Sequence, residues 1–343
     1  MNVIDIGKLT HESYLKIKDS MTKFDKESKK INDTELIKPN FRIYKSKLYN
    51  NPNKKYAYVT SVFINESYIP SALVLGKNIK MLKHKYPSVC MVQDKGYKVE
   101  KVNDSIEYFQ GVSQSCIEDL LELYDYVIGV DLLKVKNYTP SPYHFTNNDS
   151  YSNILYYVTK GQVLGLTMFE KVMYLDASSY LENNIDSVFS DFKGSTFLGD
   201  KEFEYTKVGI HGAFFLVTPN KYFYHKHMKF VKDYNTYFND LYFIRGIDEV
   251  LIFFSVFPNW STTHFDNHFA CRKNKKRAFE GCDIYHFQFD KPFRNNEKNG
   301  MESIKSHYIY YDDWDKIVKI LLKSHPQLKF YFNHIKSFRE TLF

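Results

Sequence analysis

Strand-like and helix-like segments alternate along residues 55–175. The short apolar runs, typical of buried strands, are 55–63, 89–92, 126–130 and 172–175. The segments between them in which apolar residues recur at helical spacing are 70–79, 115–123 and 160–169. Short, wholly apolar strands between helices are typical of a mainly parallel sheet that is covered on both faces. The pattern therefore predicts an α/β domain.

The last of these apolar runs ends on a carboxylate. Asp176 follows it directly, with the small residues Ala177 and Ser178 next in the chain. Ligands of such sheets bind at the carboxyl ends of the strands. An aspartate in this position can bind a divalent cation, or it can simply cap the following turn. We predict a site at Asp176 and keep the capping role as the alternative.

The first 54 residues differ in composition from the rest. The segment 11–31 is rich in Lys and Glu and carries a weak helical stripe of apolar residues, and 50–53 is typical of a turn. We predict a basic helical extension over 1–54, one α/β domain over 55–300, and a helical segment over 301–343 that packs on that domain.

The net charge is concentrated in this extension. The chain has 47 Lys and Arg against 40 Asp and Glu, a formal charge of +7. Residues 1–54 hold twelve of the basic and seven of the acidic residues, so they contribute 12 − 7 = +5. A nucleic-acid-binding protein usually spreads more positive charge over its folded part. We therefore expect no nucleic-acid partner, and we interpret the extension as a docking or dimerisation arm, which leaves a homodimer open.

The sequence also bears on location. It has no run of roughly 18 apolar residues and no hydrophobic core of a signal peptide near the N-terminus. Its four cysteines are scattered, which is typical of a reducing compartment. These features predict a cytoplasmic protein without a transmembrane segment.

Four stretches bear on function when they are considered together, in their order along the chain: 65–76, 124–131, 175–189 and 285–293. Together they resemble the glycogenin-like members of glycosyltransferase family 8. The last stretch contains His286-Phe287 followed by Lys291-Pro292, similar to the family's His-Phe-x-Gly and Lys-Pro-Trp. The resemblance implies a Rossmann-like GT-A fold and retaining transfer of a hexose from a UDP-sugar donor, with glucose as the favoured hexose. It does not identify the acceptor.

The resemblance also implies a donor site. Asn65 and Tyr68 match positions that hold the uridine, and Val62 belongs to the same part of the site. Asp176 and His286 match a set that binds a divalent cation, manganese or magnesium. The other residues that match donor-binding positions are Lys160, Ala177, Ser178 and Lys291.

Asp248 and Lys160 are the catalytic residues that the resemblance implies. Asp248 matches an aspartate beside the transferred sugar, where a carboxylate can orient the acceptor or stabilise positive charge on the sugar. Taken alone, Asp248 also fits the N-cap of a helix through 250–252, and His286 also fits a hydrogen-bonded core histidine. A solvent-exposed lysine is the corresponding alternative for Lys160 and Lys291.

Ser178 stands where the family has the second carboxylate of its Asp-x-Asp motif. A neutral hydroxyl is a poorer ligand for a hard cation than a carboxylate. Two functions therefore stay open. The first is an active, metal-assisted glycosyltransferase with a degenerate motif, Asp176-Ala177-Ser178, and the second is a catalytically degenerate binding or scaffold protein of the same fold. The retained donor-site residues favour the enzyme.

Overall fold

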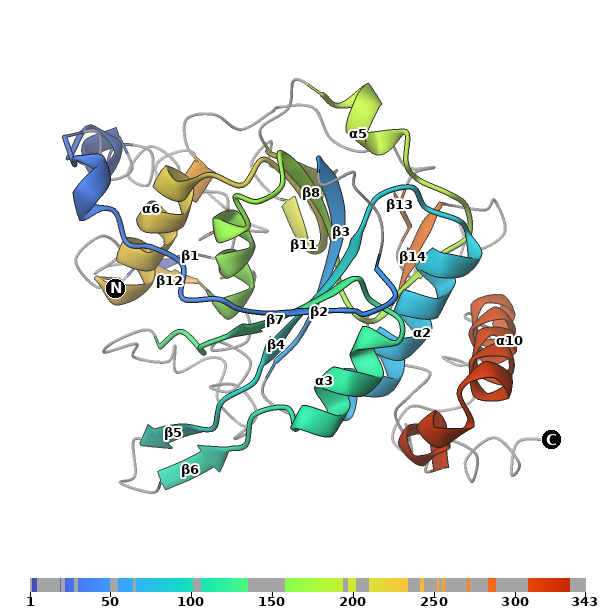
Figure 1. The fold of residues 1–343 in the computed structure, drawn as a ribbon. Coiled ribbons are helices and arrows are strands. Elements are labelled where there is room, and N and C mark those ends of the chain that lie inside the picture. Colours follow the sequence, from blue (N-terminus) through green and yellow to red (C-terminus); the bar gives the residue numbers. More distant parts are fainter. Residues whose placement is uncertain are drawn as a thin grey trace. The chain divides into compact units, whose positions relative to one another are not determined.

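Figure 1 shows the fold of the computed structural model. The chain divides into two compact units that are interleaved along the sequence. The first unit comprises Met1–Arg42, Val130–Tyr174 and Lys193–His264, and the second comprises Ile43–Gly129, Leu175–Phe192 and Phe265–Phe343. The described residues are 2–4, 19, 22–27, 30–49, 55–63, 66–100, 106–134, 158–193, 197–201, 210–233, 241–243, 252, 255–256, 270–271, 283–287 and 308–333.

Four neighbouring strands form the sheet of the second unit, in the order β3-β4-β7-β2. They are β3 (Tyr56–Val62), β4 (Ser88–Gln93), β7 (Tyr126–Val130) and β2 (Arg42–Lys45). β3 and β4 run parallel, and every residue of β4 and β7 is buried. The strands predicted at 55–63, 89–92 and 126–130 are therefore confirmed, each to within one residue at either end.

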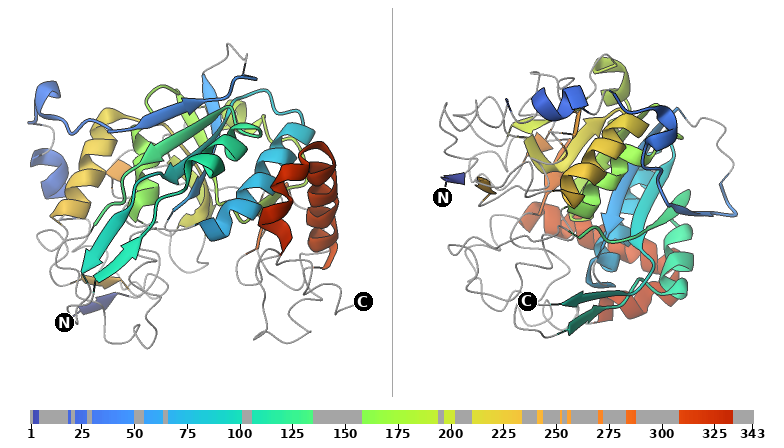
Figure 2. Two further views of the ribbon diagram at one scale, coloured as in Figure 1. Left: turned by 60° about the horizontal axis from the view of Figure 1, so that its bottom comes forward. Right: turned by 90° about the vertical axis from the view of Figure 1, so that its left-hand side faces the viewer.

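Three helices accompany this sheet in the second unit (Figures 1 and 2). They are α2 (Ile69–Met81), α3 (Gln114–Leu121) and α10 (Tyr308–Ser324). α10 runs beside α2 and continues into the 3₁₀ segment η5 (Pro326–Phe332). Leu73 of α2, Leu120 of α3 and Trp314 of α10 are at most 1% exposed and share one hydrophobic core, so burial of apolar surface holds the helices to the sheet.

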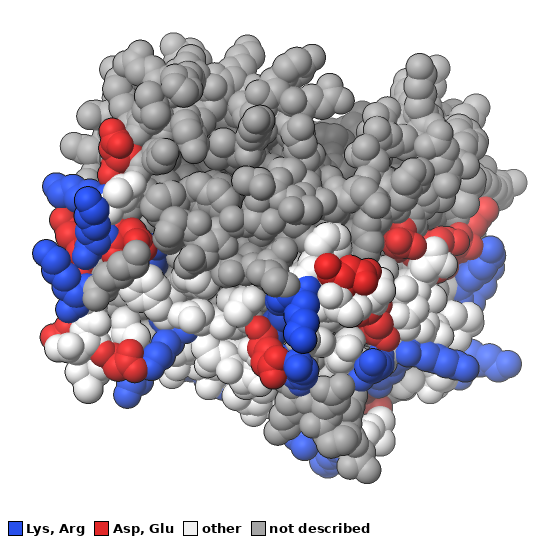
Figure 3. Space-filling model, turned by 90° about the horizontal axis from the view of Figure 1, so that it is seen from above, with Lys and Arg blue, Asp and Glu red and all other residues white. Residues whose placement is uncertain are grey.

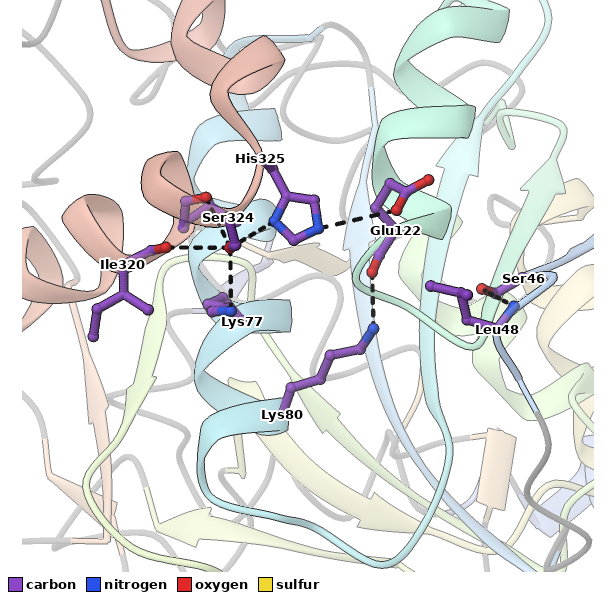
Figure 4. Close-up of polar contacts among 9 residues, drawn as sticks. Ser46, Leu48, Lys77, Lys80, Glu122, Ile320, Ser324 and His325 are labelled. Carbon is purple, nitrogen blue, oxygen red and sulfur yellow. Dashed lines mark hydrogen bonds and ion pairs between the residues drawn. The ribbon is translucent and has the colours of Figure 1, made fainter.

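Polar contacts fix the end of α10 to α2 and to the turn after α3 (Figure 4). The Ser324 hydroxyl lies 2.8 Å from His325 Nδ1 and 3.5 Å from Lys77 Nζ. His325 Nε2 in turn lies 3.9 Å from a carboxylate oxygen of Glu122, and Lys80 Nζ donates to the Glu122 carbonyl at 2.8 Å. The helical C-terminal segment is thus tied to two neighbouring helices.

A small sheet and a hairpin complete the described part of the second unit. The sheet has the order β13-β14-β9, with β13 (Ala270–Cys271), β14 (Ile284–His286) and β9 (Ser179–Leu181). The hairpin consists of the antiparallel strands β5 (Tyr97–Glu100) and β6 (Ile106–Phe109), which Figure 2 shows extending beyond β4. A short helix, α5 (Val188–Asp191), follows β9.

The first unit has strands in the order β10-β11-β8, with β10 (Phe197–Lys201) antiparallel to β11 (Ile210–Val217). β8 (Lys171–Leu175) confirms the strand predicted at 172–175. β1 (Asn2–Ile4) pairs in parallel with β12 (Leu241–Phe243). The first unit also contains the helix α6 (Lys221–Lys232) and the 3₁₀ segments η2 (Asp33–Glu35) and η4 (Gly161–Gly165).

The helix predicted over 160–169 is shorter in the structure. The helical backbone passes into η4 and ends at Gly165, because Leu166 leaves the helical region at φ −75° and ψ 49°. Both glycines of η4 pack closely against α6. A Cβ at Gly161 would lie 2.1 Å from the His227 ring, and one at Gly165 would lie 2.7 Å from Tyr224. Close packing thus requires glycines, and glycines weaken a helix.

The described part of the N-terminal extension belongs to the folded units. Residues 22–27 are helical, and Asp25 forms an ion pair with the buried Lys226 of α6 at 2.9 Å. Further on, the Ile37 amide donates to His225 Nδ1 at 3.0 Å. Burial and the nearby Lys229 lower the pKa of His225, which favours the neutral ring that this acceptor role requires. The division at residue 54 and its docking role remain predictions.

Among the described residues, none of the helices combines the length and apolar character needed to span a membrane. On the face in Figure 3, the described Lys and Arg side chains (blue) are intermixed with Asp and Glu (red), and neither charge forms a patch of its own.

Candidate active site

Three polar side chains of the second unit converge just after β8. The Ser178 hydroxyl lies 3.1 Å from His286 Nε2, and a carboxylate oxygen of Asp176 lies 3.6 Å from the same nitrogen. Ser178 is 1% and His286 5% exposed, whereas Asp176 is partly exposed. The cluster therefore combines two buried polar groups with one carboxylate that reaches toward solvent.

Antiparallel pairing of β9 with β14 brings His286 to this place. His286 lies opposite Ser179, and Tyr285 lies opposite Tyr180. The pairing is extended at one end by the Phe287 amide, which donates to the Ser178 carbonyl at 3.0 Å. The two sides of the cluster are thus held by backbone hydrogen bonds, although 108 positions separate Ser178 from His286.

Two buried polar residues of α2 hold the Asp176 side of the cluster. Ser71 Oγ donates to the Ala177 carbonyl at 2.7 Å. The Asn78 amide accepts from the Leu181 amide at 2.7 Å and donates to its carbonyl at 3.0 Å. The sequence analysis missed both residues. Their signal is that Ser71 and Asn78 are polar, lie seven residues apart on one helical face, and share that face with apolar residues.

The geometry of the cluster fits a divalent cation. With metal–ligand bonds of about 2.1 Å, neighbouring ligands of an octahedral ion lie about 3 Å apart. The distances from His286 Nε2 to Ser178 and to Asp176, 3.1 and 3.6 Å, are close to this spacing. Carboxylate oxygens suit manganese and magnesium, whereas imidazole suits transition metals. Within the described residues, no group of three or more His, Cys, Asp or Glu is placed to hold a metal, and this cluster contains two such residues, Asp176 and His286.

The predicted uridine-binding residues follow β3. The Val62 side chain is fully buried in the core of the second unit, so only its backbone could face a nucleotide. Tyr68 ends the 3₁₀ turn η3 (Glu66–Tyr68), is partly buried, and packs against the same core. Asn65, three positions beyond Val62, lies outside the described residues.

Lys160 lies in the first unit and is buried, 2% exposed. Its Nζ donates to the Gly212 carbonyl of β11 at 2.9 Å and lies 5.3 Å from the centre of the Tyr174 ring. The predicted alternative of a solvent-exposed lysine is therefore wrong for Lys160. Asp248 and Lys291 lie outside the described residues, so their roles stay predictions.

A second histidine–aspartate pair lies elsewhere in the second unit. His84 Nδ1 is 3.2 Å from Asp186 Oδ1, which also accepts from the Tyr58 hydroxyl at 2.8 Å. Asp186 Oδ2 accepts from the Lys85 amide at 3.1 Å. Burial lowers the pKa of His84, although the contact with Asp186 opposes this. This pair was not predicted from the sequence.

The architecture was compared with solved structures. The galactosyltransferase LgtC, solved in complex with donor and acceptor sugar analogs, matches 76% of this chain and 94% of its own with a TM-score of 0.51, at 11% identity. The chain has a GT-A glycosyltransferase fold. An active-site mutant of LgtC gives a TM-score of 0.52 over 77% of this chain and 95% of its own, at 10% identity. The predicted α/β fold class is therefore confirmed.

Other comparisons add one structure with a lower TM-score and one protein that is similar in sequence over part of the chain. The glycosyltransferase GlyE of Streptococcus pneumoniae matches 80% of this chain at 13% identity, with a TM-score of 0.48. An uncharacterized protein of Acanthamoeba polyphaga mimivirus is 27% identical over 134 residues, 39% of this chain. The chain spans 64% of the GlyE structure and 40% of the mimivirus protein. No protein-family profile matches the sequence.

Proposed function

We propose that the protein is a glycosyltransferase that uses a nucleotide-sugar donor, UDP-glucose being the first candidate, and retains the configuration of the transferred hexose. The observation that carries the proposal is the convergence of Asp176, Ser178 and His286 within a GT-A fold. This cluster lies where an apolar strand ends, the place at which such sheets bind nucleotides.

In this proposal Asp176 and His286 hold a divalent cation, manganese or magnesium. When bound, the cation neutralises charge that develops on the diphosphate as the sugar leaves. Ser71 and Asn78 keep the 176–181 segment in register, and the β9–β14 pairing keeps His286 facing Asp176. Because of these contacts, Asp176 and His286 need to move little when a donor binds.

Ser178 acts as a weak partner in this site. Its hydroxyl can donate to Nε2 of the neutral His286 ring, and the lone pair used there is the one that a cation would take. A carboxylate at this position would instead bind the cation directly and add negative charge. The serine should therefore lower the affinity for the metal without removing the site.

The remaining parts of the proposed donor site come from the sequence resemblance. Asn65 and Tyr68 are proposed to hold the uridine, Lys291 to meet the diphosphate, and Lys160 and Asp248 to act near the transferred sugar. The burial of Lys160 against Gly212 supports a fixed position for this lysine, because a buried amine held by a carbonyl has little freedom.

Calorimetry of UDP binding with and without manganese tests the proposal. We expect UDP to bind the natural protein, and manganese to tighten the binding about tenfold less than in the variant Ser178→Asp, a difference of about 1.4 kcal/mol. Ser178→Ala is the matched control, because it changes the same position without adding a carboxylate and so should not show the tightening expected of Ser178→Asp. Absence of UDP binding in both conditions would refute the transferase.

One observation favours the alternative of a degenerate binding protein, namely that a hydroxyl replaces the second carboxylate at Ser178. UDP binding without any hydrolysis of UDP-sugars, tested across several divalent cations, would support it. Sugar release with any one of these cations would support the enzyme.

A further inference from the structure

The 3₁₀ turn Glu66–Tyr68 is anchored by its first residue. The Ser113 amide, at the N-cap of α3, donates to Glu66 Oε1 at 2.9 Å. The Cys116 thiol, in the first turn of the same helix, also lowers the pKa of the Glu66 carboxyl group. A carboxylate at the N-terminal end of a helix also interacts favourably with the helix dipole. Glu66 is thus bonded to the N-cap of α3, the helix that follows β6.

These contacts favour the ionised form of Glu66. Partial burial alone would raise the pKa of its carboxyl group, but the hydrogen bonds from Cys116 and Ser113 outweigh burial and lower this pKa. The carboxylate therefore stays charged at neutral pH and acts only as an acceptor, as the contact with the Ser113 amide requires.

The anchor continues to the C-terminal segment. The Tyr331 hydroxyl of η5 donates to Asp119 Oδ2 at 2.8 Å and lies 3.0 Å from Cys116 Sγ. Cys116 is 2% exposed, so its contact with Tyr331 is buried. η5 thus contacts α3 through Tyr331, and α10, which continues into η5, is fastened to α2 and to the turn after α3 (Figure 4).

We propose that Glu66 is a positioning residue for nucleotide binding, which ties the turn that ends in Tyr68 to the N-terminus of α3. The inference rests on the proposed function, in which Tyr68 and the neighbouring Asn65 hold the uridine. A 3₁₀ turn of three residues has little stability of its own. Since the turn follows β3 at the carboxyl edge of the sheet, its position determines where a nucleoside could lie.

The variant Glu66→Ala tests this role by calorimetry with UDP and by the kinetics of UDP-glucose hydrolysis. We expect the Kd for UDP and the KM for the donor to rise about tenfold, with kcat within about twofold of the natural value. Glu66→Gln keeps one acceptor and should recover most of the affinity. The matched control is Glu118→Ala. Glu118 is an exposed glutamate of α3, and its carboxylate accepts a hydrogen bond from the Gln114 side chain. This substitution should leave both constants unchanged.

A second pair of variants covers the case in which Glu66→Ala does not fold. Ser113 has φ −66°, which proline can adopt, so Ser113→Pro removes the amide donor without straining the backbone at that residue. Ser113→Ala removes the hydroxyl that caps Cys116 but keeps the amide. Weaker UDP binding in the proline variant than in the alanine variant supports the anchor.

Two failures can be told apart. If the natural protein binds UDP and both Glu66→Ala and Ser113→Pro bind it within about twofold of their controls, the positioning role is overturned and the transferase proposal stands. If the natural protein binds no UDP, the proposed function is refuted, and the positioning role with it. A fall in kcat at unchanged KM would also overturn the positioning role, because an anchor of the nucleoside acts on binding.

Discussion

The second unit contains two histidine–aspartate pairs that differ in how closely they are bonded. In the first, Asp186 accepts hydrogen bonds from His84, Tyr58 and the Lys85 amide within 3.2 Å. In the second, Asp176 and His286 are 3.6 Å apart, which is longer than a hydrogen bond. The same two residue types thus share a hydrogen bond in one place and lie just beyond hydrogen-bond distance in the other.

We interpret the different spacing of the two pairs as a sign of two roles, one in stability and one in function. A carboxylate with three donors is already satisfied, so removing it exposes buried polar groups without partners. A carboxylate and an imidazole spaced for metal ligation can instead take up a cation, at the cost of some stability when the cation is absent. We therefore assign the Asp186 pair to the fold and the Asp176 pair to the site.

The largest expected effect comes from Asp176→Asn. We expect donor hydrolysis to fall by a factor of about 1,000 or more, because a carboxylate ligand of the cation is lost, while the free energy of unfolding changes by about 1 kcal/mol or less. Initial rates with UDP-glucose and manganese, together with urea unfolding, measure the two effects. Activity that persists in Asp176→Asn would remove this residue from the site.

Asp186→Asn should show the opposite pattern. Its amide cannot accept from all three donors, so we expect a loss of about 2–3 kcal/mol in the free energy of unfolding, with UDP affinity unchanged in the folded protein. Urea unfolding and calorimetry check both. Asp191→Asn, at an exposed position of α5, is the control and should be neutral. Equal free energies of unfolding for Asp186→Asn and Asp191→Asn would contradict the structural role of Asp186.

The smallest effect concerns pH and His84. Its pKa is lowered by burial, so below about pH 6.5 the unfolded chain binds a proton that the folded protein does not. This contribution to stability is therefore complete above that pH and is lost as the pH falls through the lowered pKa of the folded state. We expect His84→Gln to lose less stability than the natural protein between about pH 7 and pH 5, by up to about 1 kcal/mol.

Urea unfolding at several pH values in this range measures the difference. If the natural protein instead gains stability over His84→Gln as the pH falls, His84 is held protonated by Asp186, and the pair is an ion pair. That outcome would make the Asp186 network dependent on charge instead of on neutral hydrogen bonds.

The accuracy of the sequence analysis depended on how local each signal was. The strands β3, β4, β7 and β8 were predicted well, because each is a continuous apolar run that needs no information from elsewhere in the chain. The helix prediction over 160–169 was wrong beyond Gly165. Its glycines pack against α6, which lies far away in the sequence, so no local pattern shows that glycine is needed there. Ser71 and Asn78 were missed for a similar reason, since their partners are backbone groups of residues 177 and 181.

The sequence by itself determined the α/β class and the placement of Asp176 at the end of an apolar strand, because hydrophobic periodicity is a local property of the chain. The resemblance implied that Asp176 and His286 share a cation site, but only the tertiary structure shows how His286 comes to face Asp176 and Ser178. That meeting depends on the antiparallel register of β9 and β14, which pairs His286 with Ser179. Register between strands so far apart is set by the packing of both strands in one core, and no local pattern encodes it.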